Sequence, residues 1–172
     1  GLLIGGIVSS ILSIFIGLPC LRLRAGAYVA LTTLGFAEIG RIICMNLVGF
    51  TRGELGLWGV PTLPNIQIGS LLINFSGVSR VPYYYVSVII FFITFIILYR
   101  QINLPIGLAL KAIRESQDAA ESLGVPITRY KLLSFVISSF FAGLIGAFYA
   151  HYINILTPSS MFNVGIMVEI IA

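Results

Sequence analysis

Few charged side chains lie where they could take part in chemistry. Two of them lie within the apolar run from 27 to 48. Glu38 and Arg41 are three residues apart, so in a helix they share a face and can form an ion pair that lowers the cost of burying either charge. A charge inside a membrane span commonly marks a transport path. Thr32 and Thr33 share the segment, so Thr32, Thr33 and Glu38 are candidate pathway residues, with a structural ion pair as the alternative.

The second group of charges lies between residues 108 and 124. On a helical wheel these charges fall within about one third of the circumference, and apolar residues occupy the rest. Gly124 is a typical helix C-cap, and Pro126 prevents the helix from continuing. The pattern predicts an amphipathic helix of about four turns over 108–124. Its charged residues are Lys111, Arg114, Glu115, Asp118 and Glu121.

This polar face carries charges of both signs. One helical turn separates Lys111 from Glu115 and Arg114 from Asp118, so each pair can interact. A helix that lies on anionic lipid is expected to have a basic face. The mixed face, with two small alanines directly after Asp118, favours docking of a protein partner that approaches closely.

Motifs for several enzyme classes are absent from the sequence. It contains no phosphate-binding Gly-x4-Gly-Lys-Ser/Thr loop, no His-Glu-x-x-His and no Gly-x-Ser-x-Gly. One histidine and two distant cysteines do not make a zinc site. We therefore expect no enzymatic activity, no metal and no cofactor in this chain.

The composition is that of a membrane protein. Of the 172 residues 58% are apolar and only 9% are charged, with a mean hydropathy of +1.05; soluble domains carry about 25% charged residues. Several apolar runs approach 20 residues, the length that crosses a bilayer. We predict an all-α, polytopic helical bundle: one transmembrane domain over 1–172, cut at both ends. The expected spans are about 2–18, 27–48, 83–99, 132–152 and 163 onward.

The distribution of lysine and arginine predicts the orientation. With the 108–124 helix on the cytoplasmic side, seven basic residues lie on that side and two on the other, as the positive-inside rule requires. The net charge of +4 is therefore a topology signal, and we expect no nucleic-acid partner. The seven are Arg22, Arg24, Arg100, Lys111, Arg114, Arg129 and Lys131, and the two are Arg52 and Arg80.

Small residues recur every fourth position in two of the expected spans, which lets helix backbones approach closely. Between the second and third spans, residues 49–82 are rich in Gly and Pro and predict tight turns. Trp58 and the tyrosines at 83–85 suit a membrane interface. The small residues are Gly1, Gly5, Ser9, Ser13 and Gly17 in the first span, and Ser138, Ala142, Gly146 and Ala150 beside Ser139, Gly143 and Ala147 in the fourth.

The stretch Asp118-Ala119-Ala120-x3-Gly124 resembles the Glu-Ala-Ala-x3-Gly loop of ABC importer permeases. Wider stretches between about 18 and 152 resemble the branched-chain amino acid permease family, LivM-type subunit. The chain departs from that family at Arg52, where a glycine is usual, and from the general loop at Asp118, where Glu is usual. The stretches are Ala112 to Gly124, Thr128 to Leu132, Phe140 to Gly143, Gly146 to Ala150, Leu21 to Leu34, Phe36 to Glu38, and Thr51 to Pro61.

The resemblance implies a permease subunit of an ATP-driven importer for branched-chain or other hydrophobic amino acids, in the cell membrane of a prokaryote. The implied partners are a homologous second permease subunit, two cytoplasmic ATPases that bind the ATP, an extracytoplasmic binding protein and membrane lipid. The 108–124 helix would then be a coupling helix. The implied docking residues are Arg114, Glu115, Asp118, Ala119, Ala120 and Gly124, and Gly53, Gly56 and Gly59 would form a mobile outer loop or gate.

Two other functions remain open on the sequence. An ion-coupled secondary transporter would need ionisable groups within its spans, and Glu38 is the acidic residue that lies well inside a complete one. A membrane scaffold that transports nothing would need only the small-residue packing and the docking helix. Association with an ATPase, and uptake by the reconstituted protein, separate these alternatives.

Overall fold

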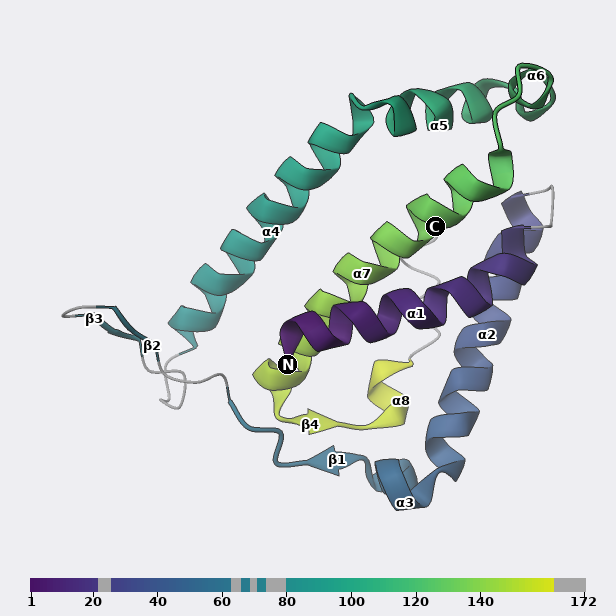
Figure 1. Ribbon diagram of the computed structural model, residues 1–172. Helices are drawn as coiled ribbons and strands as arrows, with labels where there is room; N and C mark the ends of the chain where they lie inside the picture. The colour runs from purple at the N-terminus through teal and green to yellow at the C-terminus, as the bar shows by residue number, and fades with distance from the viewer. Residues whose placement is uncertain (22–25, 63–65, 69–70, 74–79, 163–172) are drawn as a thin grey trace.

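Helices make up most of the chain. The computed structural model of the protein describes residues 1–21, 26–62, 66–68, 71–73 and 80–162. Four long helices form the body of the molecule, and the shorter elements lie at its two ends (Figure 1). The long helices are α1 (Leu2–Leu21), α2 (Gly26–Asn46), α4 (Val81–Ile102) and α7 (Ile127–Ile153). The short helices are α3 (Val48–Thr51), the 3-10 turn η1 (Gly53–Leu55), α5 (Pro105–Glu115), α6 (Gln117–Ser122) and α8 (Pro158–Met161).

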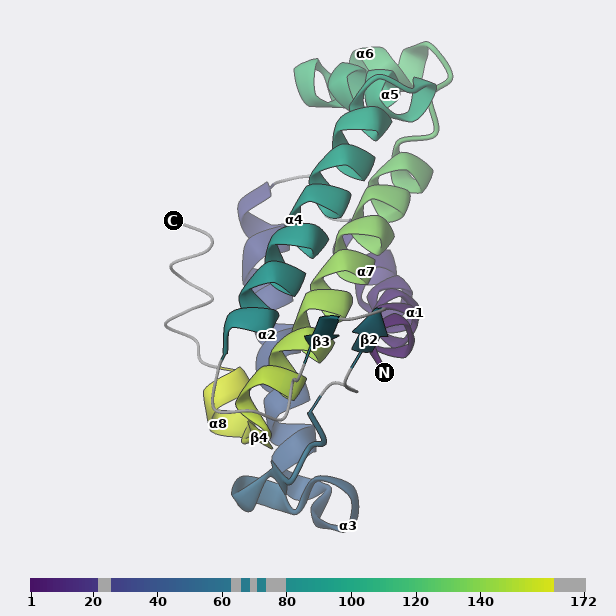
Figure 2. The same ribbon diagram turned by 90° about the vertical axis from the view of Figure 1, so that its left-hand side faces the viewer.

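Short strands pair in two places. β1 (Leu57–Trp58) pairs antiparallel with β4 (Ile155–Leu156), and this ties the segment after α2 to the segment after α7. β2 (Ile66–Ile68) pairs antiparallel with β3 (Leu71–Ile73). α3, β1, β4 and α8 gather at one end of the molecule, and α5 and α6 lie at the opposite end (Figures 1 and 2).

The tightest packing in the described residues joins α1 to α7, and small residues make it possible. A Cβ placed on Gly5 would lie 2.8 Å from the Ala147 Cβ and 3.1 Å from the Gly143 carbonyl oxygen. A Cβ on Gly143 would lie 2.7 Å from the Gly5 carbonyl oxygen and would collide with Ser9. The ladder of Ser139, Gly143 and Ala147 thus faces α1, as a packing seam requires. Gly146, in the second ladder, has no such neighbour within 4 Å.

Within the described residues, three helices are long and apolar enough to cross a membrane: residues Leu2–Cys20, Val81–Ile102 and Ile127–Ile153. α2 is not one of them, although its 21 residues would reach about 31 Å, roughly the thickness of the hydrocarbon layer. It carries the charges of Glu38 and Arg41. This architecture is an all-α, multi-pass membrane fold, as the composition predicts.

Some helices begin or end a few residues away from the expected positions. α1 does not end before Pro19 but continues through it to Leu21, at the loss of one backbone hydrogen bond near the end of the helix. α7 begins at Ile127, five residues before the expected start at 132, because the turn after α6 is so short. The expected span from 163 onward, and two of the seven basic residues, Arg22 and Arg24, lie outside the described residues.

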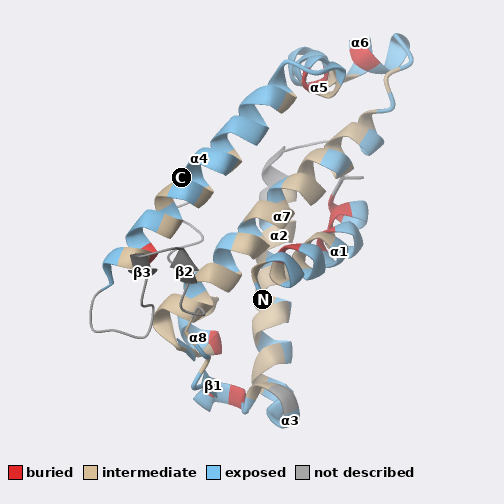
Figure 3. Cartoon of the chain, turned by 60° about the vertical axis from the view of Figure 1, so that its left-hand side comes forward, coloured by how far each residue is buried: buried red, intermediate tan, exposed pale blue. Residues whose placement is uncertain are grey.

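Few side chains are buried inside this chain. In the described part, the apolar side chains with less than a tenth of their surface exposed are Cys20, Tyr83, Ile113 and Ala120. Figure 3 shows that most of α4 is exposed along its length. Tyr83, at the start of α4, packs against Phe148 and Tyr152 of α7 with ring centroids 6.0 and 5.6 Å apart. The long apolar faces are therefore free for lipid or for other protein segments.

Candidate functional site

The structure divides the expected 108–124 helix in two. α5 ends at Glu115, Ser116 adopts an extended conformation (φ −156°, ψ 116°), and α6 begins at Gln117. The Ser116 hydroxyl accepts a hydrogen bond from the Ala119 amide at 3.3 Å, so this serine is the N-cap of α6. The prediction of one continuous four-turn helix is wrong at this residue. A serine that can cap a new helix competes with the interior of an existing one.

The predicted end of the helix at Gly124 is confirmed. The Val125 amide donates to the Ala120 carbonyl at 3.0 Å, and the Gly124 amide donates to the Glu121 carbonyl at 2.9 Å. This is the Schellman pattern of hydrogen bonds, and it requires the left-handed backbone that Gly124 adopts, with φ +81°. α7 follows after only Val125 and Pro126.

Both ends of the α5–α6 pair are held closely by the long helices. At the start of α5, a Cβ on Gly107 would lie 2.6 Å from the Gln101 carbonyl oxygen, so the turn from α4 admits no side chain there. At the end of α6, the Gly124 turn leads directly into α7. A displacement of α5 and α6 therefore displaces the adjacent ends of α4 and α7.

The predicted docking residues do not all lie on the surface. Ala119 and Gly124 are exposed, whereas Ala120 retains only 2% of its accessible surface, and Ile113 of α5 is buried as well. A third apolar side chain on this segment, Leu123, is 82% exposed at the end of α6. The charged residues Lys111, Arg114, Glu115, Asp118 and Glu121 are all exposed.

Neither of the expected pairs in this segment forms an ion pair in the described residues. Ser116 breaks the helical register between Arg114 and Asp118, so the one-turn spacing no longer applies to them. Lys111 and Glu115 share α5, but both are exposed, where such a pair contributes only about 0–1 kcal/mol. The charges of α5 and α6 are thus available to a partner.

An open apolar groove of about 450 Å³ lies beneath α5, between α4 and α7. Leu98 and Ile102 of α4 face Leu133 and Ile137 of α7 across it. Two basic side chains of α5 also line the groove. They are Lys111 and Arg114.

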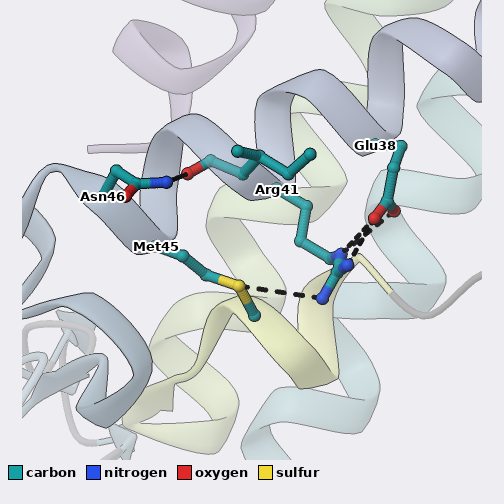
Figure 4. A network of polar contacts seen from close by, with 5 residues as sticks. Glu38, Arg41, Met45 and Asn46 are labelled. Atoms are coloured by element: carbon teal, nitrogen blue, oxygen red, sulfur yellow. Dashed lines mark hydrogen bonds and ion pairs between the residues drawn. The ribbon is translucent and has the colours of Figure 1, made fainter.

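The ion pair predicted in α2 is present. The Arg41 guanidinium donates to both carboxylate oxygens of Glu38, with Nε 3.0 Å from each, and its Nη1 lies 3.7 Å from the Met45 sulfur (Figure 4). The side chains are 31% and 39% exposed, for Arg41 and Glu38 respectively. Thr32 and Thr33 are half-buried on the same helix, about one and a half turns nearer its start.

Two of the three predicted outer-loop glycines are packed against other segments. Gly53 and Gly56 are buried, and a Cβ on Gly56 would lie 2.9 Å from the Leu156 carbonyl carbon, against the β1–β4 pair. A Cβ on Gly59 would have no neighbour within 4 Å. Arg52 adopts a left-handed conformation with φ 57°.

Two features at the end of the molecule opposite α5 and α6 were not predicted from the sequence. Cys44 of α2 lines an apolar pocket together with Met161 and Phe162 at the end of α8. No local motif predicts this pocket, because its walls come from segments more than 100 residues apart. Arg80 donates to the Tyr152 hydroxyl at 3.1 Å, and its guanidinium carbon lies 5.0 Å from the centre of that ring. The aromatic residues at 83–85 pointed to an interface but not to this pairing.

Comparison with known proteins identifies the family. Residues 1–172 match the family described as branched-chain amino acid transport system / permease component, and the chain belongs to it. It is 34% identical over 173 residues to the high-affinity branched-chain amino acid transport system permease protein LivM of Salmonella typhimurium, and 33% identical to LivM of Escherichia coli. Each alignment covers 91% of this chain and 40% of the relative.

A more distant relative carries a different name. The chain is 23% identical over 160 residues to the nucleoside ABC transporter permease protein NupC of Lactococcus lactis, an alignment that covers 89% of this chain and 48% of the relative. The chain thus spans less than half the length of the curated relatives it matches. No solved structure matches it.

Proposed function

We propose that this family member is part of the permease subunit of an ABC importer for branched-chain or similar hydrophobic amino acids, in the cell membrane of a prokaryote. The names of the relatives that are 33–34% identical to it support the substrate class. The observation that carries the coupling role is the α5–α6 pair, whose charged side chains are exposed and which is joined by tight turns to two long helices.

The α5–α6 end is proposed to face the cytoplasm. In the described residues five lysines and arginines lie at this end: Arg100 at the end of α4, Lys111 and Arg114 in α5, and Arg129 and Lys131 at the start of α7. Arg52 and Arg80 lie at the opposite end. An excess of positive charge on one side is the established signal for the cytoplasmic face.

A cytoplasmic ATPase that docks on α5 and α6 would move α4 and α7 as rigid bodies. The two turns that join these elements have little room to absorb a displacement, because Gly107 lies against the end of α4 and Gly124 leads into α7 after two residues. ATP binding and hydrolysis would bias the permease between two arrangements of its long helices, which is the rigid-body type of switch. ATP would be bound by the partner, and a second permease subunit and an extracytoplasmic binding protein would complete the importer.

The docking surface is proposed to comprise the exposed members of the predicted set: Arg114, Glu115, Asp118, Ala119 and Gly124. The small side chain of Ala119 lets a partner approach α6 closely. Ala120 has a different role, because its buried side chain packs α6 against the rest of the chain.

The test of docking is co-purification of the ATPase with the full-length permease in mild detergent. Ala119→Trp places a large side chain on the exposed face of α6 and is expected to abolish recovery of the ATPase. Leu55→Trp is the matched control, because Leu55 is 71% exposed at the other end of the molecule. Ala120→Trp is unsuitable, since it would disrupt the interior and confuse folding with docking.

The result decides between the alternatives. ATPase recovered with the wild type and with Leu55→Trp, but not with Ala119→Trp, supports the importer and the docking surface. ATPase recovered with all three keeps the importer but refutes this surface. ATPase recovered with none favours a secondary transporter or a scaffold, which uptake by the reconstituted protein then distinguishes.

The substrate class has one specific competitor, because one relative is a nucleoside permease. Uptake of radiolabelled leucine and uridine by the complete importer separates the two. We expect leucine to be taken up and unlabelled isoleucine or valine to compete with it. Uptake of uridine without leucine would refute the amino-acid assignment.

A further inference from the structure

We propose that the groove between α4, α5 and α7 is a binding site for an anionic phospholipid. Lys111 and Arg114 hold the phosphate of the lipid, and one of its acyl chains lies between α4 and α7. Such a site goes beyond the proposed transport function and would be present whichever substrate is carried. No sequence motif marks it, because three separate helices supply its walls.

The groove is apolar where it runs between the two long helices. Its volume of about 450 Å³ lies within the range of about 300–1,000 Å³ that is usual for small-molecule sites. Leu98 and Ile102 of α4 and Leu133 and Ile137 of α7 form these apolar walls. Both helices are long and apolar enough to cross a membrane, so walls near their ends would meet the part of a lipid just below its headgroup.

The position of α5 places it at the membrane surface. α4 has 22 residues and a length of about 33 Å, roughly the thickness of the hydrocarbon layer. α5 begins after only two further residues and runs from the end of α4 toward the start of α7 (Figure 1). The helix therefore lies over the groove at the level of the lipid headgroups.

The charges that line the groove are both positive. One face of α5 lines it, and the residues of this face recur at the three- and four-residue spacing of a helix. They are Ile106, Gly107, Leu110, Lys111 and Arg114. Glu115 of α5 and the two acidic residues of α6 do not line the groove. This arrangement suits an anionic lipid and disfavours a zwitterionic one, whose ammonium group would be repelled by two like charges.

Both basic side chains are exposed, and neither forms an ion pair with another of the described residues. A guanidinium can bind a phosphate through two parallel hydrogen bonds, and a lysine ammonium binds it as a point charge. Basic pockets between spanning helices on the cytoplasmic side are typical sites for anionic headgroups, and this is the side proposed for α5. A soluble phosphate would pair with Lys111 and Arg114 but would leave the apolar walls without a ligand.

The headgroup contact is tested with the complete importer in detergent, titrated with phosphatidylglycerol or phosphatidylcholine of the same acyl chains and followed by native mass spectrometry. We expect the wild type to bind phosphatidylglycerol more tightly. Lys111→Gln should weaken phosphatidylglycerol binding about fivefold, since one basic residue near an anionic membrane surface is worth about 1 kcal/mol, and should leave phosphatidylcholine binding unchanged. Arg129→Gln is the matched control, because Arg129 is exposed at the same end but does not line the groove.

The acyl-chain contact is tested by Leu133→Trp, which fills the apolar part of the groove without a change of charge. It should weaken phosphatidylglycerol binding by about fourfold for each methylene that it displaces. Ile145→Trp is the matched control, because Ile145 is 49% exposed on the same helix but lies outside the groove. All variants are compared at equal amounts of folded protein, measured by circular dichroism.

Weaker phosphatidylglycerol binding in both groove variants, with both controls like the wild type, would support the site. Equal binding of the two lipids by the wild type, or unchanged phosphatidylglycerol binding in either groove variant, would overturn it; this is the result expected if the rest of the chain or the second permease subunit fills the groove. Displacement of the lipid by excess glycerol phosphate would also overturn it, in favour of a site for soluble phosphate. The proposed function would stay intact, because ATPase recovery and leucine uptake test it separately.

Discussion

Gly143→Ala is the most direct perturbation of the seam between α1 and α7. The new methyl group would lie 2.7 Å from the Gly5 carbonyl oxygen and would collide with the Ser9 side chain. Carbon and carbonyl oxygen normally approach to about 3.3–3.6 Å. The two helices must therefore separate locally by more than half an ångström, because the obstacle on α1 is backbone and cannot rotate away.

The cost follows from that separation. A gap of about 0.5–1 Å removes a quarter to a half of the attraction of each contact that it opens. Overpacking of a well-packed interior costs about 1–3 kcal/mol, which is roughly a 5- to 150-fold change in the folding equilibrium. Packing of this kind is the main attraction between helices in a membrane, so we expect Gly143→Ala to destabilise the protein by about 1–3 kcal/mol on the same estimate.

The control is the same substitution three residues further along α7. A Cβ on Gly146 would have no neighbour within 4 Å. Alanine is favoured over glycine inside a helix by about 0.5–1 kcal/mol, so Gly146→Ala is expected to be neutral or stabilising. Both variants of the full-length protein would be unfolded reversibly in mixed detergent micelles and followed by circular dichroism. Equal stability of the two variants, or a less stable Gly146→Ala, would refute the assignment of the seam to this face.

Three further predictions concern backbone conformation, and each has a local readout. Ser116→Ala removes the N-cap of α6 at a cost of about 1 kcal/mol, so hydrogen exchange of the Ala119 amide should be about fivefold faster; an unchanged rate would contradict the cap. Gly124→Ala places a methyl group at φ +81°, costs about 1–2 kcal/mol and should accelerate exchange of the Val125 amide, whereas Leu123→Ala should not. Arg52→Gly removes the strain of a left-handed backbone at φ 57° and should raise the free energy of unfolding by up to about 1 kcal/mol. A lower melting temperature would show that the Arg52 side chain stabilises the protein by more than its left-handed backbone destabilises it.

The sequence predicted the features that depend on regular spacing. Hydrophobic length pointed to long helices, and the four-residue recurrence of small side chains pointed to two possible packing faces of α7, of which the structure uses the one with Gly143 against α1. The spacing of Glu38 and Arg41 predicted an ion pair that the structure contains. The Gly124 and Pro126 signals marked the end of α6, because their effects on the backbone are local and strong.

Features that depend on competition between local structures, or on contacts between distant segments, were not predicted. Ser116 is acceptable within a helix and at an N-cap, and no Glu or Gln at position 119 completes a capping box that would have signalled the break. The wheel over 108–124 therefore grouped charges that the structure separates. Ala120 was expected in the docking surface because it is small and lies beside the mixed-charge face, yet it is buried by tertiary packing. The pocket at Cys44 depends on β1 pairing with β4, which no local pattern encodes.

The extended conformation of a single residue, Ser116, sets the direction of α6 relative to α5. Because the Gly124 turn joins α6 closely to α7, a change of backbone at this position would re-aim α6 and move the adjacent end of α7 with it. A lineage that acquires a different partner at this end would therefore have to adjust residue 116 and the start of α7 together.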